Sequence, residues 1–214
     1  LRDVSEVRRH EQELMTKDAT IREIHHRVKN NLQTVSALLR LQSRRSSEEA
    51  VKVALAEAER RVQAIATVHA ALSQNVDESV DFDEVARTIV RMAGAIASTD
   101  HAVEVITTGS FGTIQADQAQ ALATVLNELV ANSVEHGLAD RDGLIEVRAE
   151  REGASMTVTV ADDGVGFVPG TPMSGLGTQI VHQMVRGELK GSIEWAPRVG
   201  GGTLVTLHAN LDPA

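Results

Sequence analysis

Two groups of residues in this chain of 214 residues have types and spacings suited to chemistry. The first is a pair of histidines, His25 and His26, within a run of helix-forming residues. The second is a series of later motifs: Asn127-Glu128-Leu129-Val130-Ala131-Asn132, Asp162-Asp163-Gly164-Val165-Gly166, Gly175-Leu176-Gly177 and Gly200-Gly201-Gly202-Thr203. In this order the later motifs are typical of an ATP pocket. A nucleotide pocket that follows a helix-borne histidine predicts transfer of a phosphoryl group from ATP to the imidazole.

The first of the later motifs falls on a predicted helix over residues 117–137. Glu128, Asn132 and His136 are spaced four apart, so they share one stripe of that helix. An asparagine inside a helix is mildly unfavourable, but its amide oxygen is a hard ligand that suits a Mg²⁺ bound to nucleotide phosphates. Considered alone, the stripe is equally consistent with a solvated polar helix face.

The acidic and glycine motifs predict the other walls of the pocket. Asp162 follows a predicted strand, where its carboxylate can accept a hydrogen bond from the exocyclic amine of adenine. Gly164 and Gly166 would let the backbone pass close to the base. Gly175 and Gly177 precede a helix whose exposed N–H groups can bind phosphates. Each Gly-x-Gly is weak by itself, but the ordered set, with a Gly-Gly-Thr strand start after it, is specific.

A predicted helical hairpin must position the histidines. Residues 5–45 contain no Pro or Gly and carry apolar residues every seven positions, the spacing of a coiled-coil or bundle seam: Leu14, Ile21, Val28 and Val35. With this seam buried, His26 lies on the outward face and His25 at the edge of the seam. A second helix to about Asn75 would complete an antiparallel hairpin. Its apolar face predicts a second copy, giving a four-helix bundle.

The rest of the chain has the pattern of an α+β sandwich, with helices on one side of a mixed sheet. We place the boundary between the domains at 1–76 and 77–214. The second domain has predicted helices over 82–98, 117–137 and 176–186, and predicted strands over 101–107, 144–151, 154–161, 192–196 and 203–209.

Composition and charge exclude several classes of protein. The chain has no Cys, which excludes disulfides and thiolate chemistry. No apolar run approaches the roughly 20 residues of a membrane span, and there is no secretory signal; we expect a cytoplasmic location. Residues 76–214 carry a net charge of −12, which disfavours a broad nucleic-acid surface. The chain begins at Leu1 without Met, so we expect it to be part of a longer protein.

These motifs resemble those of a known family. The second half is similar to the Bergerat ATP-binding fold of histidine kinases and type II topoisomerases. Residues 24–33, with Leu38-Leu39-Arg40-Leu41-Gln42 behind them, resemble the second dimerisation and phosphoacceptor class of the histidine kinases, which is related to bacterial light- and stress-sensing kinases.

The resemblance implies a role for each matching residue. His26 would be the phosphoacceptor and Asn132 the Mg²⁺ ligand, while Asp162 would read adenine. Other residues of the ATP site would be His136, Gly164, Gly166, Gly175, Gly177, Gly202 and Thr203. The implied cofactors are ATP and Mg²⁺, and the implied partners are a response-regulator receiver domain and a second copy of the chain. Residues 1–6 are similar to the end of a PAS sensor domain running into its signalling helix.

Some residues depart from the family pattern and leave alternatives open. Arg27, rather than an acidic residue, follows His26, so the general base could be Glu23 or Glu128. The lid between Gly166 and Gly175 has only eight residues. The Trp-x-Glu signature of the sister class is absent, and Trp195 is expected to be a packing residue.

The function of Asn30 is also open. It lies four residues after His26, where the family often has a Thr or Asn that orients the water removing phosphate from the partner regulator. Alternatively, Asn30 is simply solvated. Two rival functions remain: an ATPase in which Glu128 activates water and the hairpin only binds partners, and a degenerate kinase that acts as a scaffold.

Overall fold

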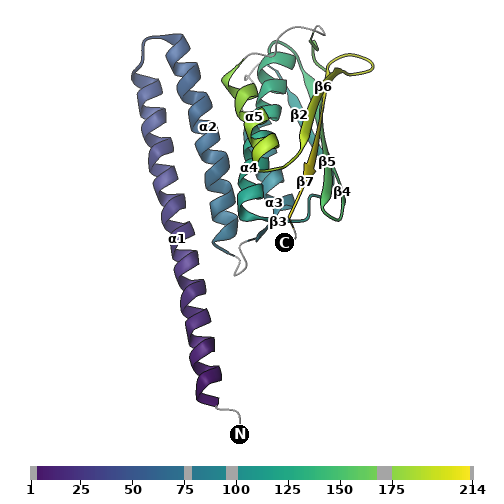
Figure 1. Ribbon diagram of the computed structural model, residues 1–214. Helices are drawn as coiled ribbons and strands as arrows, with labels where there is room; N and C mark the ends of the chain where they lie inside the picture. Colours follow the sequence, from purple (N-terminus) through teal and green to yellow (C-terminus); the bar gives the residue numbers. More distant parts are fainter. Residues whose placement is uncertain (1–3, 75–78, 95–100, 168–174, 213–214) are drawn as a thin grey trace.

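The computed structural model describes residues 4–74, 79–94, 101–167 and 175–212, and only the backbone of residues 4–18 and 94. A helical hairpin comes first and an α+β domain follows it (Figure 1). The elements are α1 (Val4–Arg45), α2 (Glu49–Leu72), β1 (Ser79–Asp81), α3 (Phe82–Gly94), β2 (Val103–Gly109), β3 (Thr113–Gln115), α4 (Ala116–Asn132), η1 (Ser133–Gly137), β4 (Gly143–Glu152), β5 (Ser155–Asp162), α5 (Leu176–Gly187), β6 (Ser192–Pro197) and β7 (Thr203–Asn210).

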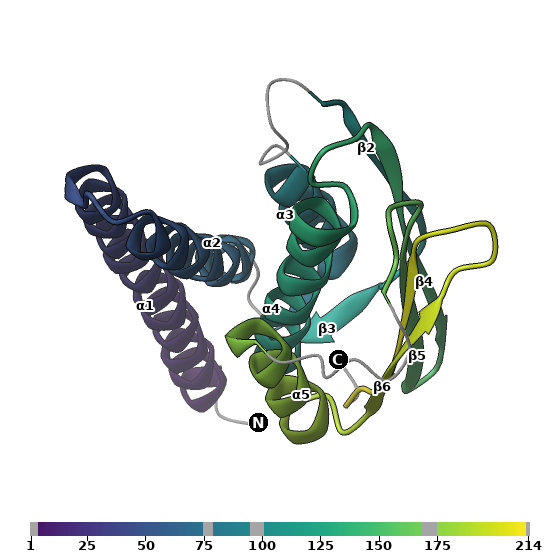
Figure 2. The same ribbon diagram turned by 90° about the horizontal axis from the view of Figure 1, so that it is seen from above.

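The α+β domain confirms the predicted sandwich. A five-stranded sheet of order β2-β4-β5-β7-β6 has β2 parallel to β4 and its other neighbours antiparallel. Helices α3, α4 and α5 lie against one face of the sheet (Figure 2). Alternate residues of the central strands face these helices and are buried: Ile145, Val147, Ala149, Met156, Val158, Val160, Val205, Leu207 and Ala209. The other face of the sheet is open to solvent.

Helix α4 is the centre of the domain. Every residue from Gln118 to Ala131 except Gln120 is buried, because α4 packs on α2, α3 and α5 as well as on the sheet side of the core. At its C-terminal end the helix widens into the π-turn η1, closed by the Leu138 N–H donating to the Ser133 carbonyl at 2.9 Å. The predicted helix 117–137 therefore ends at Gly137 as expected, but its last turn is wider than an α-helix.

A short two-stranded sheet was not predicted. Strands β1 and β3 have three residues each and pair antiparallel, with Val80 opposite Ile114. Strands of this length carry too little alternation to be recognised in a sequence. Together they hold the start of α3, where the Asp83 carboxylate accepts a hydrogen bond from the Phe111 N–H at 2.7 Å.

The hairpin is antiparallel as predicted, but its buried seam differs in detail. Ser36 is buried between α1 and α2 and donates a hydrogen bond to Glu59 at 3.1 Å. Val35, which the seven-residue spacing assigned to the seam, is 42% exposed. The side chain of Leu14 and the predicted domain boundary after residue 76 lie outside the described residues. At this level the residue that faces α2 is thus Ser36, one position after the predicted Val35, and Val35 lies on the outer surface.

Helix α2 is the hairpin's contact with the α+β domain. It lies between α1 and the rest of the molecule (Figures 1 and 2). Val68 and Leu72 are buried and belong to the main hydrophobic core. Of the described helices, none is long and apolar enough to cross a membrane.

Candidate ATP-binding site and phosphoacceptor helix

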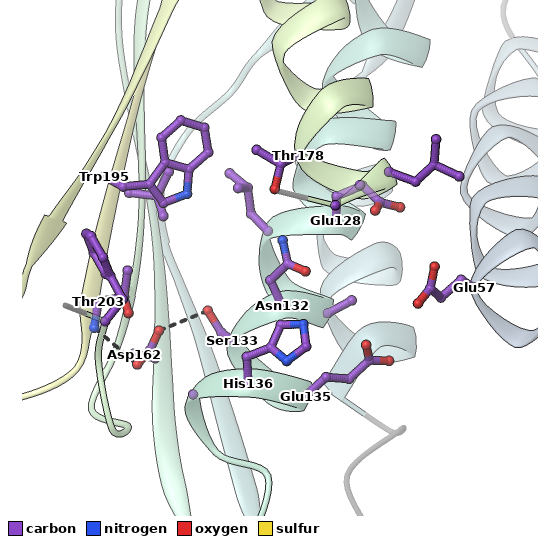
Figure 3. A pocket seen from close by; sticks show the side chains of 18 of the residues that line it. Glu57, Glu128, Asn132, Ser133, Glu135, His136, Asp162, Thr178, Trp195 and Thr203 are labelled. Atoms are coloured by element: carbon purple, nitrogen blue, oxygen red, sulfur yellow. Dashed lines mark hydrogen bonds between the residues drawn. The ribbon is translucent and has the colours of Figure 1, made fainter. Parts of the chain in front are cut away.

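A pocket of about 340 Å³ opens between α2, α4, the start of α5 and the inner face of strands β5, β6 and β7. It is lined by Glu57, Arg60, Arg61, Glu128, Leu129, Ala131, Asn132, Ser133, Glu135, His136, Gly137, Asp162, Gly166, Phe167, Gly175, Leu176, Gly177, Thr178, Trp195, Thr203 and Val205. The stripe Glu128, Asn132 and His136 therefore faces the pocket together with Asp162, as Figure 3 shows.

Asp162 is the anchor of the sheet side of the pocket. Its Oδ1 accepts hydrogen bonds from the N–H groups of Gly164 and Thr203 at 3.0 and 3.2 Å. Its Oδ2 accepts one from the Ser133 hydroxyl at 3.2 Å (Figure 3). A carboxylate has about four acceptor positions, so one remains for an amine in the pocket. These bonds also fix the direction of the carboxylate, whose residue is only 2% exposed.

Asn132 is available for a cation. It is half-buried at the pocket wall, and its side chain makes no hydrogen bond with any residue that the structure describes. In Figure 3 it lies between Asp162 and Glu128. The π-turn that begins after Asn132 turns Ser133 toward Asp162 and places His136 at the mouth of the pocket, where it is exposed.

The glycines of the site divide into two roles. Gly166, Gly175 and Gly177 line the pocket. Gly164 and Gly202 do not line it. A Cβ on Gly164 would lie 2.2 Å from the Gly137 carbonyl oxygen, and one on Gly202 would lie 1.9 Å from that of Asp162. Gly164 and Gly202 thus let backbone segments pack around Asp162. Of the two glycines predicted to lie close to the base, Gly164 and Gly166, only Gly166 lines the pocket.

The apolar wall of the pocket includes a residue that we expected only to pack. Trp195 lines the pocket from β6 and lies against the imidazole of His182, with ring centroids 5.2 Å apart. Phe167 lines the opening where the lid begins; the lid residues 168–174 lie outside the described residues. The one Trp of the chain is therefore a wall of the site.

Arginines from the hairpin close the other side of the pocket, which the sequence did not reveal. The Arg61 Nε and Nη2 donate to the two carboxylate oxygens of Glu128 at 2.8 and 2.9 Å. Arg60 pairs with Glu135 at 2.7 Å. The hydrogen bonds that Arg61 donates to Glu128 raise the pKa of Arg61, which stays charged. No local sequence signal links residues 67 positions apart.

His26 lies outside the pocket, on α1. Its side chain is exposed and contacts no hydrogen-bonding partner among the described residues. The neighbouring His25 points the other way, toward α2, where its Nδ1 is 3.0 Å from the Nδ1 of His69. Burial, together with the charge on His25, lowers the pKa of His69. The structure thus separates the two adjacent histidines, with only His26 open to a reactant.

The two candidate general bases are both paired with arginines. Glu23 accepts hydrogen bonds from Arg27, at 2.6 and 3.0 Å, on the exposed surface of α1. Glu128 is held by Arg61 in the pocket. Asn30 lies one turn beyond His26 and is exposed, and its carbonyl accepts a hydrogen bond from the Thr34 hydroxyl.

Comparison with known proteins identifies the class of this two-part arrangement. Residues 23–96 match the HisKA_2 family, described as histidine kinase, and residues 117–213 match the HATPase_c family, described as histidine kinase-, DNA gyrase B- and HSP90-like ATPase. The second domain is thus an ATP-binding domain. The chain therefore belongs to the histidine kinases that these two family models describe.

Individual relatives agree with this assignment. The chain is 47% identical over 216 residues to the sensor histidine kinase PdtaS of Mycolicibacterium smegmatis, covering 99% of this chain but 43% of that protein. It is 28% identical to blue-light-activated histidine kinase 2 of Erythrobacter litoralis, over 91% of this chain and 58% of that protein. The chain therefore spans less than half the length of its mycobacterial relative.

Solved structures share the fold. The histidine kinase domain of a blue-light activated histidine kinase from Erythrobacter litoralis superposes with a TM-score of 0.59 at 23% identity, covering 94% of both chains. A longer structure of that kinase gives 0.65 at 24% identity, covering 93% of this chain and 60% of the other.

Proposed function

We propose that the pocket binds Mg²⁺·ATP and that its γ-phosphoryl group is transferred to a ring nitrogen of His26, and from there to an aspartate of a response-regulator receiver domain. The observation that carries this proposal is the convergence of Asp162, Asn132 and the glycine start of α5 on one pocket beside the histidine-bearing hairpin. Because the reaction needs ATP, we place it in the cytoplasm.

The chemistry of the pocket fits this ligand. Asp162 accepts three hydrogen bonds, which leaves one of its roughly four acceptor positions for the adenine amine. Asn132 has a free amide oxygen for Mg²⁺. Gly175 has open space around its Cα, with nothing within 4 Å of a Cβ built there, so phosphates can reach the N–H groups of α5. Catalysis in phosphoryl transfer is mainly positioning and charge neutralisation.

The arrangement in the structure is not the one in which transfer occurs. The His25–His69 contact sets His26 level with Val68 and His69 on α2. Arg61, at the pocket, is eight residues earlier on α2, about 12 Å along the axis at 1.5 Å per residue. Reacting atoms must come within about 3.5 Å. The ATP-binding domain must therefore move along the hairpin, or the His26 of a second copy must supply the acceptor.

The second copy would complete the hairpin. Ile24, Val35 and Leu38 form one exposed stripe of α1, and they are 51%, 42% and 55% exposed. Spacings of 11 and 3 residues keep the three side chains on one face of the helix, as a helix-packing seam requires. We propose a homodimer in which these stripes meet in a four-helix bundle. The proposed upstream sensor domain concerns residues before α1; residues 1–3 lie outside the described residues.

The reaction is tested by incubation with γ-labelled ATP. We expect label on the protein that is labile in acid and stable in alkali, as for phosphohistidine. The variant His26→Gln should lose the label but still bind ATP, and the control His25→Gln should keep much of it. Label that survives in the His26 variant would show another acceptor. Phosphate release without labelled protein would favour the rival ATPase, in which Glu128 activates water.

Asn30 has a separable role in this scheme. An exposed amide one turn from His26 can both donate to and accept from a water attacking the phosphorylated regulator. We expect Asn30→Ala to keep phosphorylation of His26 but to slow the loss of phosphate from the regulator. Equal decay with the variant and the parent, where the parent accelerates decay, would leave Asn30 as a solvated surface residue.

A further inference from the structure

The arginines that line the ATP pocket belong to the hairpin and not to the ATP-binding domain. Among the described lining residues, the only Lys or Arg side chains are Arg60 and Arg61, both on α2 of the hairpin. The ATP-binding domain lines the same pocket with the carboxylates of Glu128, Glu135 and Asp162. A triphosphate carries several negative charges, which this acidic wall would repel. Cationic partners for it, other than a metal ion, must therefore come from the hairpin.

Arg61 is already beside the expected phosphate position. A Cβ built on Gly177 would lie 2.4 Å from the Glu128 Oε2 and 3.6 Å from the Arg61 Nη2. The guanidinium therefore stands next to the first turn of α5, whose free N–H groups face the pocket. Arg60, by contrast, reaches Glu135 in the η1 turn, on the other side of Asn132 from Glu128.

The order of groups across the pocket points to the terminal phosphate. Asp162 and Glu128 lie on opposite sides of Asn132 (Figure 3). With adenine at Asp162 and the Mg²⁺ at Asn132, the end of the triphosphate lies toward Glu128 and α2. ADP lacks the group that would reach furthest in this direction.

Arg61 is held in a form suited to exchange its partner. Its side chain is 16% exposed and that of Glu128 is 8% exposed, and two parallel N–H···O bonds join them. The planar guanidinium binds a phosphate with the same two-pronged geometry as a carboxylate. Arg61 can therefore exchange the carboxylate for a phosphate that offers the same arrangement of oxygens.

We propose that Arg61 is a nucleotide-binding residue that the hairpin contributes to the ATP site, and that the γ-phosphate replaces Glu128 as its partner. This inference rests on the proposed ATP-binding function. The exchange has two effects: the hairpin senses ATP rather than ADP, and the Glu128 carboxylate is released when the triphosphate is in place. If Glu128 is the base that accepts the proton of the His26 imidazole, it would thus become free only with ATP bound.

The test is the preference for ATP over ADP, measured with Mg²⁺ by calorimetry and by the fluorescence of Trp195. A β,γ-imido analogue of ATP avoids turnover. We expect Arg61→Ala to weaken binding of the analogue about 10-fold or more, the worth of a charge-assisted hydrogen-bond pair, and to change ADP affinity less than about 2-fold. The control Arg40→Ala also breaks an arginine–glutamate contact, with Glu59 inside the hairpin and away from the pocket, and should keep the parent's preference.

One further variant and two outcomes decide the matter. If Arg61→Ala is poorly folded because Glu128 is left unpaired, the double variant Arg61→Gln, Glu128→Gln removes both charges and should show the same loss of preference for the ATP analogue. Unchanged or tighter binding of both nucleotides would overturn the inference, because Arg61 would then only hold the domains together. If the parent binds neither nucleotide, the proposed function itself fails.

Discussion

The two halves of the chain differ in how completely each buries its own apolar surface. Helix α4 in the ATP-binding domain is buried at every position from Ala121 to Ala131. In the hairpin, by contrast, Ile24, Val35 and Leu38 of α1 are exposed, as are Val51 and Val53 of α2. The only buried residues of α2 are near its C-terminal end, at the contact with the other domain. With α2 packed on it, the ATP-binding domain thus leaves little of α4 exposed, while the hairpin leaves apolar side chains of both its helices at the surface.

A cavity in the core of the ATP-binding domain should have the largest effect on stability. Leu126 is 1% exposed at the centre of α4, so we expect Leu126→Ala to lower the free energy of unfolding by about 2–5 kcal/mol, measured by urea denaturation. The matched change Leu38→Ala on the open stripe should cost less than about 0.5 kcal/mol in dilute solution. Similar losses at both positions would contradict the contrast between the halves.

Recognition of the adenine base should depend on the ATP-binding domain alone. Asp162→Asn keeps the shape but removes the charge that accepts three hydrogen bonds. At about 1.5–3 kcal/mol for a bond to a charged group, we expect ATP affinity to fall roughly 10- to 100-fold, measured by calorimetry. Self-association should be unchanged. Affinity for ATP equal to the parent, with GTP bound neither better nor worse, would reject base recognition by Asp162.

Self-association should depend on the hairpin alone. A lysine at Leu38 places a charge in the stripe that we propose to be the dimer seam, so Leu38→Lys should weaken the dimer at least about 10-fold, as measured by light scattering across a concentration series. Arg148→Ala, an exposed change on the open face of the sheet, is the control. A parent that is monomeric at high micromolar concentration would remove the basis of this prediction.

Lowering the pH should reduce the stability of the two halves in different pH ranges. These effects should be smaller than those of the substitutions above. His69 has a pKa lowered by burial and by His25 from its usual 6.5, so the unfolded hairpin binds more protons. Its contribution to stability is present above pH 6.5 and is lost as pH falls from 6.5 through the lowered value. We expect a small decrease in the thermal midpoint between pH 7.5 and 5.5 that is absent in His69→Gln.

Asp83 should respond only at lower pH. Burial would raise the pKa of Asp83, but hydrogen bonds from Phe111, Ser110 and Gly112 outweigh it and hold the pKa below its usual 3.8. The corresponding stability is present above pH 3.8 and is lost as pH falls below that value. Asp83→Asn should therefore leave the midpoint's behaviour near pH 6 unchanged. A change there would mean that the His69 contact is not the source.

The sequence predicted what depends on local patterns. The helix over 117–137 was recognisable from its periodicity, and Asp162 and the glycines from their spacing. It could not show the Arg61–Glu128 pair, because that contact depends on how two domains dock. It could not decide which seam Val35 belongs to, because a seven-residue apolar repeat does not distinguish a seam within one chain from a seam between two. It also assigned Trp195 to packing, because only the sheet order brings β6 to the pocket wall.

The unequal lengths of the two hairpin helices have a mechanical consequence. Helix α1 has 42 residues and α2 has 24, so the N-terminal part of α1 extends past its partner as a single rod (Figure 1). From Val4 to His26 this rod rises about 33 Å at 1.5 Å per residue. A continuous hydrogen-bonded helix is stiff in torsion, so a twist imposed near Val4 arrives at His26 as nearly the same rotation. Successive side chains on a helix point about 100° apart. A rotation of α1 by a small fraction of that angle would therefore change the direction of the His26 imidazole, so α1 would transmit rotation from its N-terminal end to the histidine.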